Sequence, residues 1–491
     1  MTDELRASIQ DLVQTRTMKV FEFFSELSSI PRPSKKEEKV QAWLQSISEK
    51  HGWPCRTDTS GNVVISVPAT PGRTHEAPVI LQGHQDMVCE KTPDSTHNFD
   101  TDPIQLQVDG EWLTAHKTTL GADNGIAIAI ALALATDEDA NHPPLEILCT
   151  VDEETGLTGA AQLDPSLLTG RCMLNLDSED EGVLTVGCAG GTDTALELAL
   201  ERGSFPDTYS VFRLSVSGLR GGHSGVDIHQ KRANANVLLA HTLYRLLDEG
   251  PILLSDIAGG SAHNAIPRDS RAVFATRTSY ERLTAACADV SASLSRQFGT
   301  WEPNISVRID TADPGQACVS AEQTRDIVHL LCSLPHGVQA MSPDIAGLVE
   351  TSVNFATIQV EGSTLRLGLS QRSSVQEEMS LLTRRIHAIG SLGGARVTDR
   401  NSYPGWKPDL GSTILKRCQS VYRETFGREP VVEAIHAGLE CGVIGAKFDS
   451  MDMVSLGPTI QSPHSPDERL HIQSVEKVYQ FLVEVLAPVT H

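Results

Sequence analysis

Short apolar runs alternate with amphipathic stretches along the first 190 residues of the chain. Four runs of strand length predict β-strands, at residues 62–67, 78–83, 146–151 and 172–177. An apolar stretch at 125–136 and an amphipathic stretch at 12–29 predict helices. Strands that alternate with helices are typical of an α/β fold, in which helices cover both faces of a mostly parallel sheet. We therefore expect functional side chains where the strands end.

The start of a further helix is predicted after two prolines. Ser34 and Glu37 have the spacing of a capping box, in which each side chain satisfies a backbone N–H of the first helical turn. Apolar residues then recur at Val40, Leu44 and Ile47, which lie on one helical face.

The pattern changes near residue 190 and changes back near residue 400. Between these points the strands alternate polar and apolar residues more openly, and helices separate them. This pattern predicts an inserted α+β domain over 192–400, with helices on one face of a sheet and a division into two similar halves. Residues 1–191 and 401–491 would then form the two parts of one mostly parallel sheet domain.

Length and charge narrow the classes of function. A chain of 491 residues is too long for one hydrophobic core, which agrees with two or more domains. With 63 acidic and 40 basic residues, the formal charge of −23 disfavours nucleic acid and anionic membranes as partners. The sequence shows no secretory signal pattern, no apolar run of membrane-spanning length and only scattered cysteines. We expect a soluble cytoplasmic protein with reduced thiols.

Acidic and histidine side chains cluster just after the predicted strands of the first domain. They are His84, Asp86, Asp123, Glu153, Glu154, Asp177 and, in a loop near the C-terminus, His464. Each of them alone has an ordinary structural explanation, such as a helix cap or a solvated surface. Together they are hard to explain structurally, because charges at the ends of buried strands are costly unless they are paired or bound to a metal.

This combination of side chains suits a hydrolytic zinc site, since imidazole and carboxylate groups bind Zn²⁺, and Co²⁺ or Mn²⁺ as substitutes. Two ions about 3.5–4 Å apart could share one carboxylate. We expect His84 and Asp177 on one ion, Glu154 and His464 on the other, and Asp123 between them. Two acids would remain free of metal. Glu153 would act as general base, and Asp86 would orient the ring of His84.

Several motifs also resemble a known family. GHQDMV at 83–88, TLGADNGIA at 119–127, TVDEETGLTGA at 150–160 and LNLDSE at 174–179 resemble the dizinc exopeptidases, which include aminoacylases, carnosinases and glutamate carboxypeptidases. Within that family, five further motifs are most similar to the bacterial aminoacyl-histidine dipeptidases. They are GCAGG at 187–191, GLRGGHSG at 218–225, DRNSYPGWKPD at 399–409, HAGLECG at 436–442 and GPTIQSPHSPDERL at 457–470.

The resemblance implies the same seven site residues in the same roles, and a cis peptide bond between Asp123 and Asn124. It also implies that the inserted domain is a lid or dimerisation domain. His223 of this domain would bind the substrate carbonyl and stabilise the oxyanion. Asn264, Arg372 and the backbone N–H of Gly438 would bind the C-terminal carboxylate of the substrate.

The function implied is zinc-dependent hydrolysis of dipeptides, in particular Xaa-His dipeptides such as β-alanyl-histidine. An aminoacylase or a tripeptidase with the same two-zinc chemistry is the first alternative. A non-catalytic metal-binding protein of this fold is the second, although Glu153 would then have no purpose. The resemblance favours a homodimer. It leaves open whether His223 acts within its own chain or across the dimer.

Overall fold

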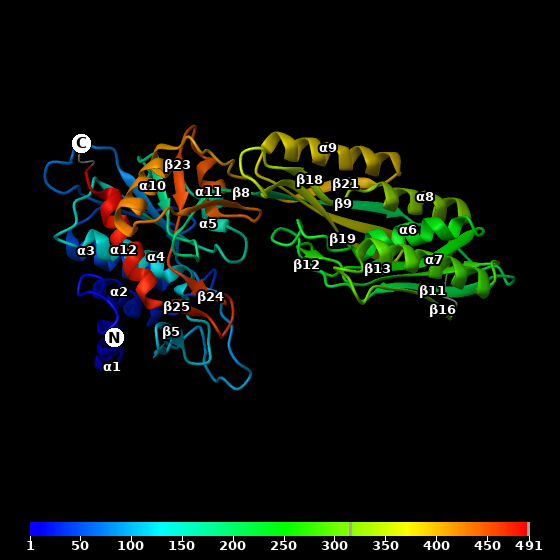
Figure 1. Cartoon of the computed structure of the whole chain (residues 1–491), viewed down its shortest axis with the longest axis horizontal. Coiled ribbons are helices and arrows are strands. Elements are labelled where there is room, and N and C mark those ends of the chain that lie inside the picture. Colours follow the sequence, from blue (N-terminus) through cyan, green and yellow to red (C-terminus); the bar gives the residue numbers. More distant parts are fainter. Residues whose placement is uncertain (314–316, 489–491) are drawn as a thin grey trace. The chain divides into compact units, whose positions relative to one another are not determined.

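The computed structural model describes residues 1–313 and 317–488 and divides the chain into two compact units (Figure 1). The first unit consists of residues 1–187, 408–434 and 439–491. The second unit consists of residues 188–407 and the short segment 435–438. The chain thus leaves the first unit, forms most of the second, and returns.

An eight-stranded sheet forms the centre of the first unit, in the order β1-β2-β6-β3-β7-β23-β8-β22. Its strands are β1 (Cys55–Thr57), β2 (Val63–Val67), β3 (Val79–His84), β6 (Leu145–Thr150), β7 (Cys172–Asn175), β8 (Val183–Cys188), β22 (Val431–Ile435) and β23 (Asp452–Ser455). The four central strands β6, β3, β7 and β23 run parallel, whereas β1 and β2 on one side and β8 on the other pair antiparallel. The predicted α/β class is confirmed, with antiparallel strands added at the flanks.

Helices pack against this sheet. Every residue of β6 is buried, which requires cover on both faces of the sheet. The helices of this unit include α2 (Met18–Ser28), α3 (Glu38–His51), α4 (Ala122–Ala135), α10 (Thr413–Phe426), α11 (Glu440–Gly445) and α12 (Ile472–Leu486). Helix α4 is apolar all round because α2 and α12 pack against it while it packs on β3 and β6.

Two local predictions had different outcomes. The peptide bond between Asp123 and Asn124 is cis, and both residues depart from helical geometry at the start of α4. The capping box at Ser34 and Glu37 was a wrong prediction. Ser34 Oγ donates instead to Asp86, at 2.8 Å, and the Glu37 carboxylate accepts from two backbone N–H groups outside α3. A buried carboxylate at hydrogen-bond distance outcompetes the helix end for the hydroxyl.

The second unit is built on a nine-stranded antiparallel sheet, in the order β16-β11-β15-β13-β19-β20-β9-β21, with β18 paired to β19. Its strands are β9 (Gly190–Ala199), β11 (Ser210–Ser217), β13 (Ile252–Gly259), β15 (Ser270–Thr276), β16 (Ser306–Thr311), β18 (Gly337–Met341), β19 (Val349–Glu361), β20 (Thr364–Ser373) and β21 (Arg396–Tyr403). Its four long helices are α6 (Ala235–Leu247), α7 (Tyr280–Phe298), α8 (Ala321–Ser333) and α9 (Gln376–Leu392), which share one hydrophobic core with the sheet (Figure 1). The pairing of β13 with β19 joins both halves into this single sheet.

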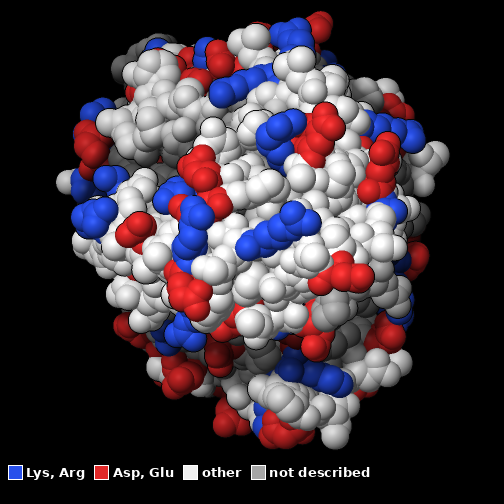
Figure 2. All heavy atoms as spheres, turned by 90° about the vertical axis from the view of Figure 1, so that its right-hand side faces the viewer, with Lys and Arg blue, Asp and Glu red and all other residues white. Residues whose placement is uncertain are grey.

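The surface in Figure 2, seen from the right-hand side of Figure 1, shows Lys and Arg interspersed with Asp and Glu. The net charge of −23 is therefore not gathered into one acidic patch on this face. Among the described residues, none of the helices combines the length and the apolar character that crossing a bilayer requires.

Candidate functional site

The parallel strands of the first unit deliver the predicted residues to one edge of the sheet. His84 is the last residue of β3, Glu153 and Glu154 follow β6 by a few residues, and Asp177 comes two residues after β7. The carboxyl ends of parallel neighbours meet at the same edge, so these side chains converge. Two further residues arrive from elsewhere. Asp123 lies at the kinked start of α4, and His464 lies in the loop after β24 (Ile460–Gln461).

Asp123 lies between two groups of candidate ligands. Its Oδ1 is 3.2 Å from Nε2 of His84, and its Oδ2 is 3.1 Å from Nε2 of His464. Asp177 Oδ1 lies 3.6 Å from the same nitrogen of His84, and Glu154 Oε2 lies 3.0 Å from the same nitrogen of His464. The five side chains thus form two sets. One set contains His84 and Asp177, the other contains His464 and Glu154, and Asp123 belongs to both.

The residues present fit divalent metal ions. Ligand atoms of His84, Asp123 and Glu154 all lie within 4.8 Å of one another. Among the described residues, Asp177 Oδ1 and Glu154 Oε1 are buried without a hydrogen-bond partner. Burying these oxygens is costly unless a cation binds them. Hydrogen bonds to Asp123 and Glu154 raise the pKa of His464 to about 11, and burial raises the pKa of Asp177. The shift of His464 shows that the carboxylates beside it favour positive charge, whereas the shift of Asp177 shows that burial disfavours its negative charge unless a cation compensates it.

Asp86 holds the ring of His84 and the loop after β6. Its Oδ1 lies 3.2 Å from Nδ1 of His84, and its two oxygens accept hydrogen bonds from the backbone N–H groups of Glu153 and Glu154. Burial opposes ionisation of Asp86, but hydrogen bonds from His84 and from Ser34 outweigh it and lower its pKa to about 2. A proton held on Nδ1 of His84 by Asp86 leaves Nε2 free to bind a metal.

Glu153 differs from its neighbours because its carboxylate makes no hydrogen bond or ion pair within residues 1–313 and 317–488, whereas its backbone N–H is fixed by Asp86. Burial raises the pKa of Glu153 to about 8, and the nearby carboxylates of Glu440 and Glu154 add to the shift. A carboxylate with a pKa near neutrality, held beside candidate metal ligands, has the properties of a general base.

Two charged residues that the sequence analysis did not assign support this cluster. Glu468 is buried and accepts hydrogen bonds from the backbone N–H groups of four consecutive residues, Leu120, Gly121, Ala122 and Asp123. Arg32 is 2% exposed and donates to the carbonyl groups of Gln85, Asp86 and Gly121. Both side chains bind backbone, and no spacing in the sequence distinguishes such residues from surface charges.

A third unassigned charged residue contacts the ends of the same strands. Glu440, at the start of α11, is buried and accepts hydrogen bonds from Gln82 Nε2 at 2.6 Å and from Thr150 Oγ1 at 2.7 Å. Burial raises its pKa to about 7. Glu440 thus connects α11 to the last residues of β3 and β6.

The second unit contains the other predicted residues. Nδ1 of His223 accepts from the backbone N–H groups of Gly225 and Val226, at 3.3 and 3.1 Å. Burial and the charge of Arg372 lower the pKa of His223. The ring is therefore neutral at pH 7 with its proton on Nε2, where it can donate a hydrogen bond to an oxygen.

Gly225 lies between His223 and Arg372. A Cβ atom at this glycine would be 3.1 Å from the ring of His223 and 3.3 Å from Nε of Arg372, so the two side chains lie near each other. Asn264 is exposed, and its backbone carbonyl accepts a hydrogen bond from the backbone N–H of Ser224. Gly438 lies two residues before α11, rather than in the first turn of that helix. The second unit thus brings His223 and Arg372 together.

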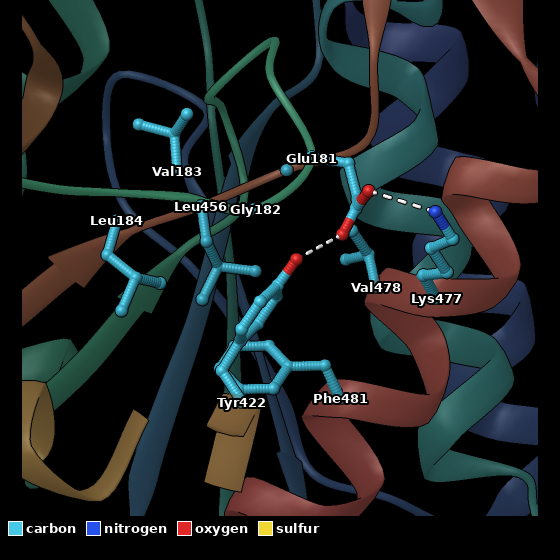
Figure 3. A pocket seen from close by; sticks show the side chains of 10 residues that line it. Glu181, Gly182, Val183, Leu184, Tyr422, Leu456, Lys477, Val478 and Phe481 are labelled. Carbon is cyan, nitrogen blue, oxygen red and sulfur yellow. Dashed lines mark hydrogen bonds and ion pairs between the residues drawn. The ribbon is translucent and has the colours of Figure 1, made fainter. Parts of the chain in front are cut away.

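A small hollow elsewhere in the first unit does not offer an alternative site. Figure 3 shows Glu181 directed toward the hydroxyl of Tyr422 and the ammonium group of Lys477. The ring of Phe481 lies against the ring of Tyr422. The cavity measures only about 10 Å³, enough for roughly one water molecule. The paired charges here are explained by packing between β8, α10 and α12.

The whole chain is similar to known peptidases. Residues 80–487 match the model of the peptidase family M20/M25/M40, which covers both units. The chain belongs to this family. The M20 peptidase is accordingly a hydrolase that acts on peptide bonds.

Individual relatives span almost the whole chain. The cytosol non-specific dipeptidase of Escherichia coli (strain K12) is 37% identical over 479 residues, covering 97% of this chain and 99% of the relative. The crystal structure of the aminoacylhistidine dipeptidase from Vibrio alginolyticus is also 37% identical, with a TM-score of 0.91 over 98% of this chain and 99% of its own. Aminopeptidase PepT from Bacillus cereus shares the fold at 16% identity, with a TM-score of 0.57 over 96% of this chain and 98% of its own.

Proposed function

We propose that this M20 peptidase is a two-zinc dipeptidase that hydrolyses Xaa-His dipeptides, including β-alanyl-histidine. The observation that carries the proposal is the position of Asp123 between two imidazole–carboxylate sets, with Glu153 left free beside them. The names of the relatives from Escherichia coli and Vibrio alginolyticus support dipeptides as substrates. One of those names is non-specific and the other specifies histidine, so the breadth of substrates needs a direct test.

Five residues would hold the metal ions. His84, Asp177 and Asp123 would bind one ion, and Asp123, Glu154 and His464 the other. Co²⁺ or Mn²⁺ could replace Zn²⁺ with these ligands. When bound, such ions supply Lewis acidity, which polarises a carbonyl group and makes water more acidic.

The chain's own residues would perform the proton transfers. Glu153 takes a proton from the attacking water and returns it to the leaving amine. Asp86 keeps the proton of His84 on Nδ1 throughout. His223, with its proton on Nε2, donates a hydrogen bond to the carbonyl oxygen as negative charge develops there, which is typically a large contribution to catalysis.

The second unit would also bind the end of the substrate. Arg372 has the planar donor geometry that matches a carboxylate, and we assign it to the C-terminal carboxylate of the dipeptide. The side chain of Asn264 and the backbone N–H of Gly438 would add hydrogen bonds to the same group. Recognition of the free C-terminal carboxylate would restrict the substrates to short peptides.

We further propose that the protein is a cytoplasmic homodimer that uses the second unit, residues 192–400 in the division made from the sequence, as a lid or dimerisation domain. The name of the Escherichia coli relative supports the cytosol. Sedimentation of the purified protein over a range of concentrations tests the dimer, and a monomer at every concentration would contradict it.

The decisive experiment is hydrolysis of β-alanyl-histidine by the purified protein, before and after chelation and after addition of Zn²⁺, with the bound metal counted. Activity that disappears on chelation and returns with two zinc ions per chain is expected. Other dipeptides, tripeptides and N-acyl amino acids should be cleaved more slowly. Preference for a tripeptide or an N-acyl amino acid would establish the tripeptidase or aminoacylase alternative. Metal binding without any hydrolysis would establish the non-catalytic one.

A further inference from the structure

A row of directly paired residues crosses four neighbouring strands of the second unit. Ser352 of β19 pairs with Arg372 of β20, Arg372 pairs with Gly191 of β9, and Gly191 pairs with Tyr403 of β21. Directly paired residues of antiparallel strands place their side chains on the same face of a sheet. Arg372 and Tyr403 therefore flank Gly191 on one face.

The missing side chain of Gly191 lets the two flanking residues meet. A Cβ atom at Gly191 would lie 2.5 Å from the ring of Tyr403, so only glycine allows the ring to cover this position. A register shift between Arg400 and Tyr403 brings the tyrosine opposite Gly191. Across the glycine, Arg372 Nη1 donates a hydrogen bond to the hydroxyl oxygen of Tyr403 at 3.3 Å.

The same hydroxyl lies beside Gly438. A Cβ atom on Gly438 would be 3.3 Å from the hydroxyl oxygen of Tyr403 and 2.9 Å from its ring. The segment that carries Gly438 is fixed over the row, because the ring of His436 hydrogen bonds to Ser352 at 2.7 Å. Arg372, the Tyr403 hydroxyl and Gly438 thus form one group.

The guanidinium group of Arg372 has unused hydrogen-bond donors within the described part of the chain. Arg372 is only 8% exposed, yet within the described part of the chain its guanidinium makes one hydrogen bond, to Tyr403, its Nε is buried without a partner, and no carboxylate forms an ion pair with it. A buried guanidinium with unused donors is costly unless a ligand supplies the acceptors. The oxygen of Tyr403 accepts from Arg372, so its own proton is free to donate. Burial also raises the pKa of this hydroxyl, which keeps the proton in place at neutral pH.

We propose that Tyr403 is a substrate-binding residue that donates a hydrogen bond to the C-terminal carboxylate of the peptide, beside Arg372. The inference rests on the proposed dipeptidase function, because it assumes that Arg372 binds that carboxylate. Tyr403 would then contribute to discrimination between peptides with a free C-terminus and peptides whose C-terminus is blocked.

The test compares alanyl-histidine with alanyl-histidinamide, which lacks the carboxylate charge. Dissociation constants of both ligands are measured by calorimetry on the zinc-loaded protein with Glu153→Gln, which should bind without turnover. The measurement is repeated after adding Tyr403→Phe, which removes only the hydroxyl. Tyr244→Phe is the matched control, because Tyr244 is 49% exposed and its hydroxyl makes no hydrogen bond among the described residues.

Tyr403→Phe should reduce the preference for the free acid over the amide by about tenfold or more, since a hydrogen bond to a charged group is lost. Tyr244→Phe should leave the preference unchanged. An unchanged preference in Tyr403→Phe, or equal weakening of both ligands, would overturn the inference and leave Tyr403 with a packing role. Hydrolysis by the wild-type protein is measured separately, so failure of the proposed function is distinguished from failure of this inference.

Discussion

The carboxylate of Glu468 accepts hydrogen bonds from four consecutive backbone N–H groups, the last of which belongs to Asp123. The distances lie between 2.7 and 3.2 Å. Glu468 comes four residues after His464 in the same loop. One loop therefore provides a candidate metal ligand and also holds the backbone of the carboxylate that both metal sets would share.

We predict that Glu468→Gln weakens zinc binding by about 10- to 100-fold, the usual effect of losing a residue that orients metal ligands. The amide group of glutamine would point donors at backbone N–H groups, which also donate. Zinc affinity is measured by competition with a chelator, with thermal unfolding followed in parallel. Glu138→Gln is the matched control, because Glu138 is exposed and its side chain makes no hydrogen bond or ion pair in the described part of the chain. Equal zinc affinity in both variants would refute this role of Glu468.

Asp86→Asn should also lower zinc affinity by about 10- to 100-fold, because asparagine cannot hold the His84 ring and the loop after β6 as a charged acceptor does. Ser34→Ala removes only one of the hydrogen bonds to Asp86 and should have a smaller effect. Both affinities can be measured by metal titration calorimetry. A larger loss in Ser34→Ala than in Asp86→Asn would contradict this ranking.

Glu153→Gln is expected to reduce kcat by about 10²- to 10⁴-fold while the zinc content stays unchanged, since a general base is lost but no ligand is removed. Steady-state kinetics on a dipeptide and elemental analysis of the same samples check this. Loss of zinc together with activity would instead make Glu153 a metal ligand.

The second unit should lose stability on acidification because of His336. Nδ1 of this ring accepts hydrogen bonds from Asn234 Nδ2 and from the backbone of Phe355, and burial lowers the pKa of His336 to about 4. Between pH 4 and 6.5 the unfolded chain binds a proton that the folded protein does not. The free energy of unfolding therefore falls as the pH drops through this window, by at most about 3 kcal/mol.

Urea unfolding at pH 7 and pH 4.5, followed by a probe in the second unit, measures this change. His336→Asn keeps an acceptor near the position of Nδ1 but cannot titrate, so it should show a smaller loss between the two pH values. The same loss in both proteins would show that other groups cause the acid sensitivity.

The positions of the strands and of the candidate ligands could be predicted because they depend on local patterns. Each of the four strands predicted in the first 190 residues matches one of β2, β3, β6 and β7 to within two residues. Parallel strands end at a common edge, so His84 and Asp177 had to come close once the sheet was assumed. The capping box failed for the opposite reason. Ser34 found a better partner in Asp86, which is 52 residues away in sequence.

The sequence by itself determined the α/β class, the strand ends and the chemistry of the site, because apolar periodicity and ligand type are local properties. Only the tertiary structure decided which buried charges support that site. Glu468 binds backbone about 345 residues away, and Tyr403 reaches Arg372 only across Gly191. Such contacts depend on sheet register and on which loops are packed together. Neither property leaves a periodic trace along the chain, so the fold had to be known before these residues acquired a role.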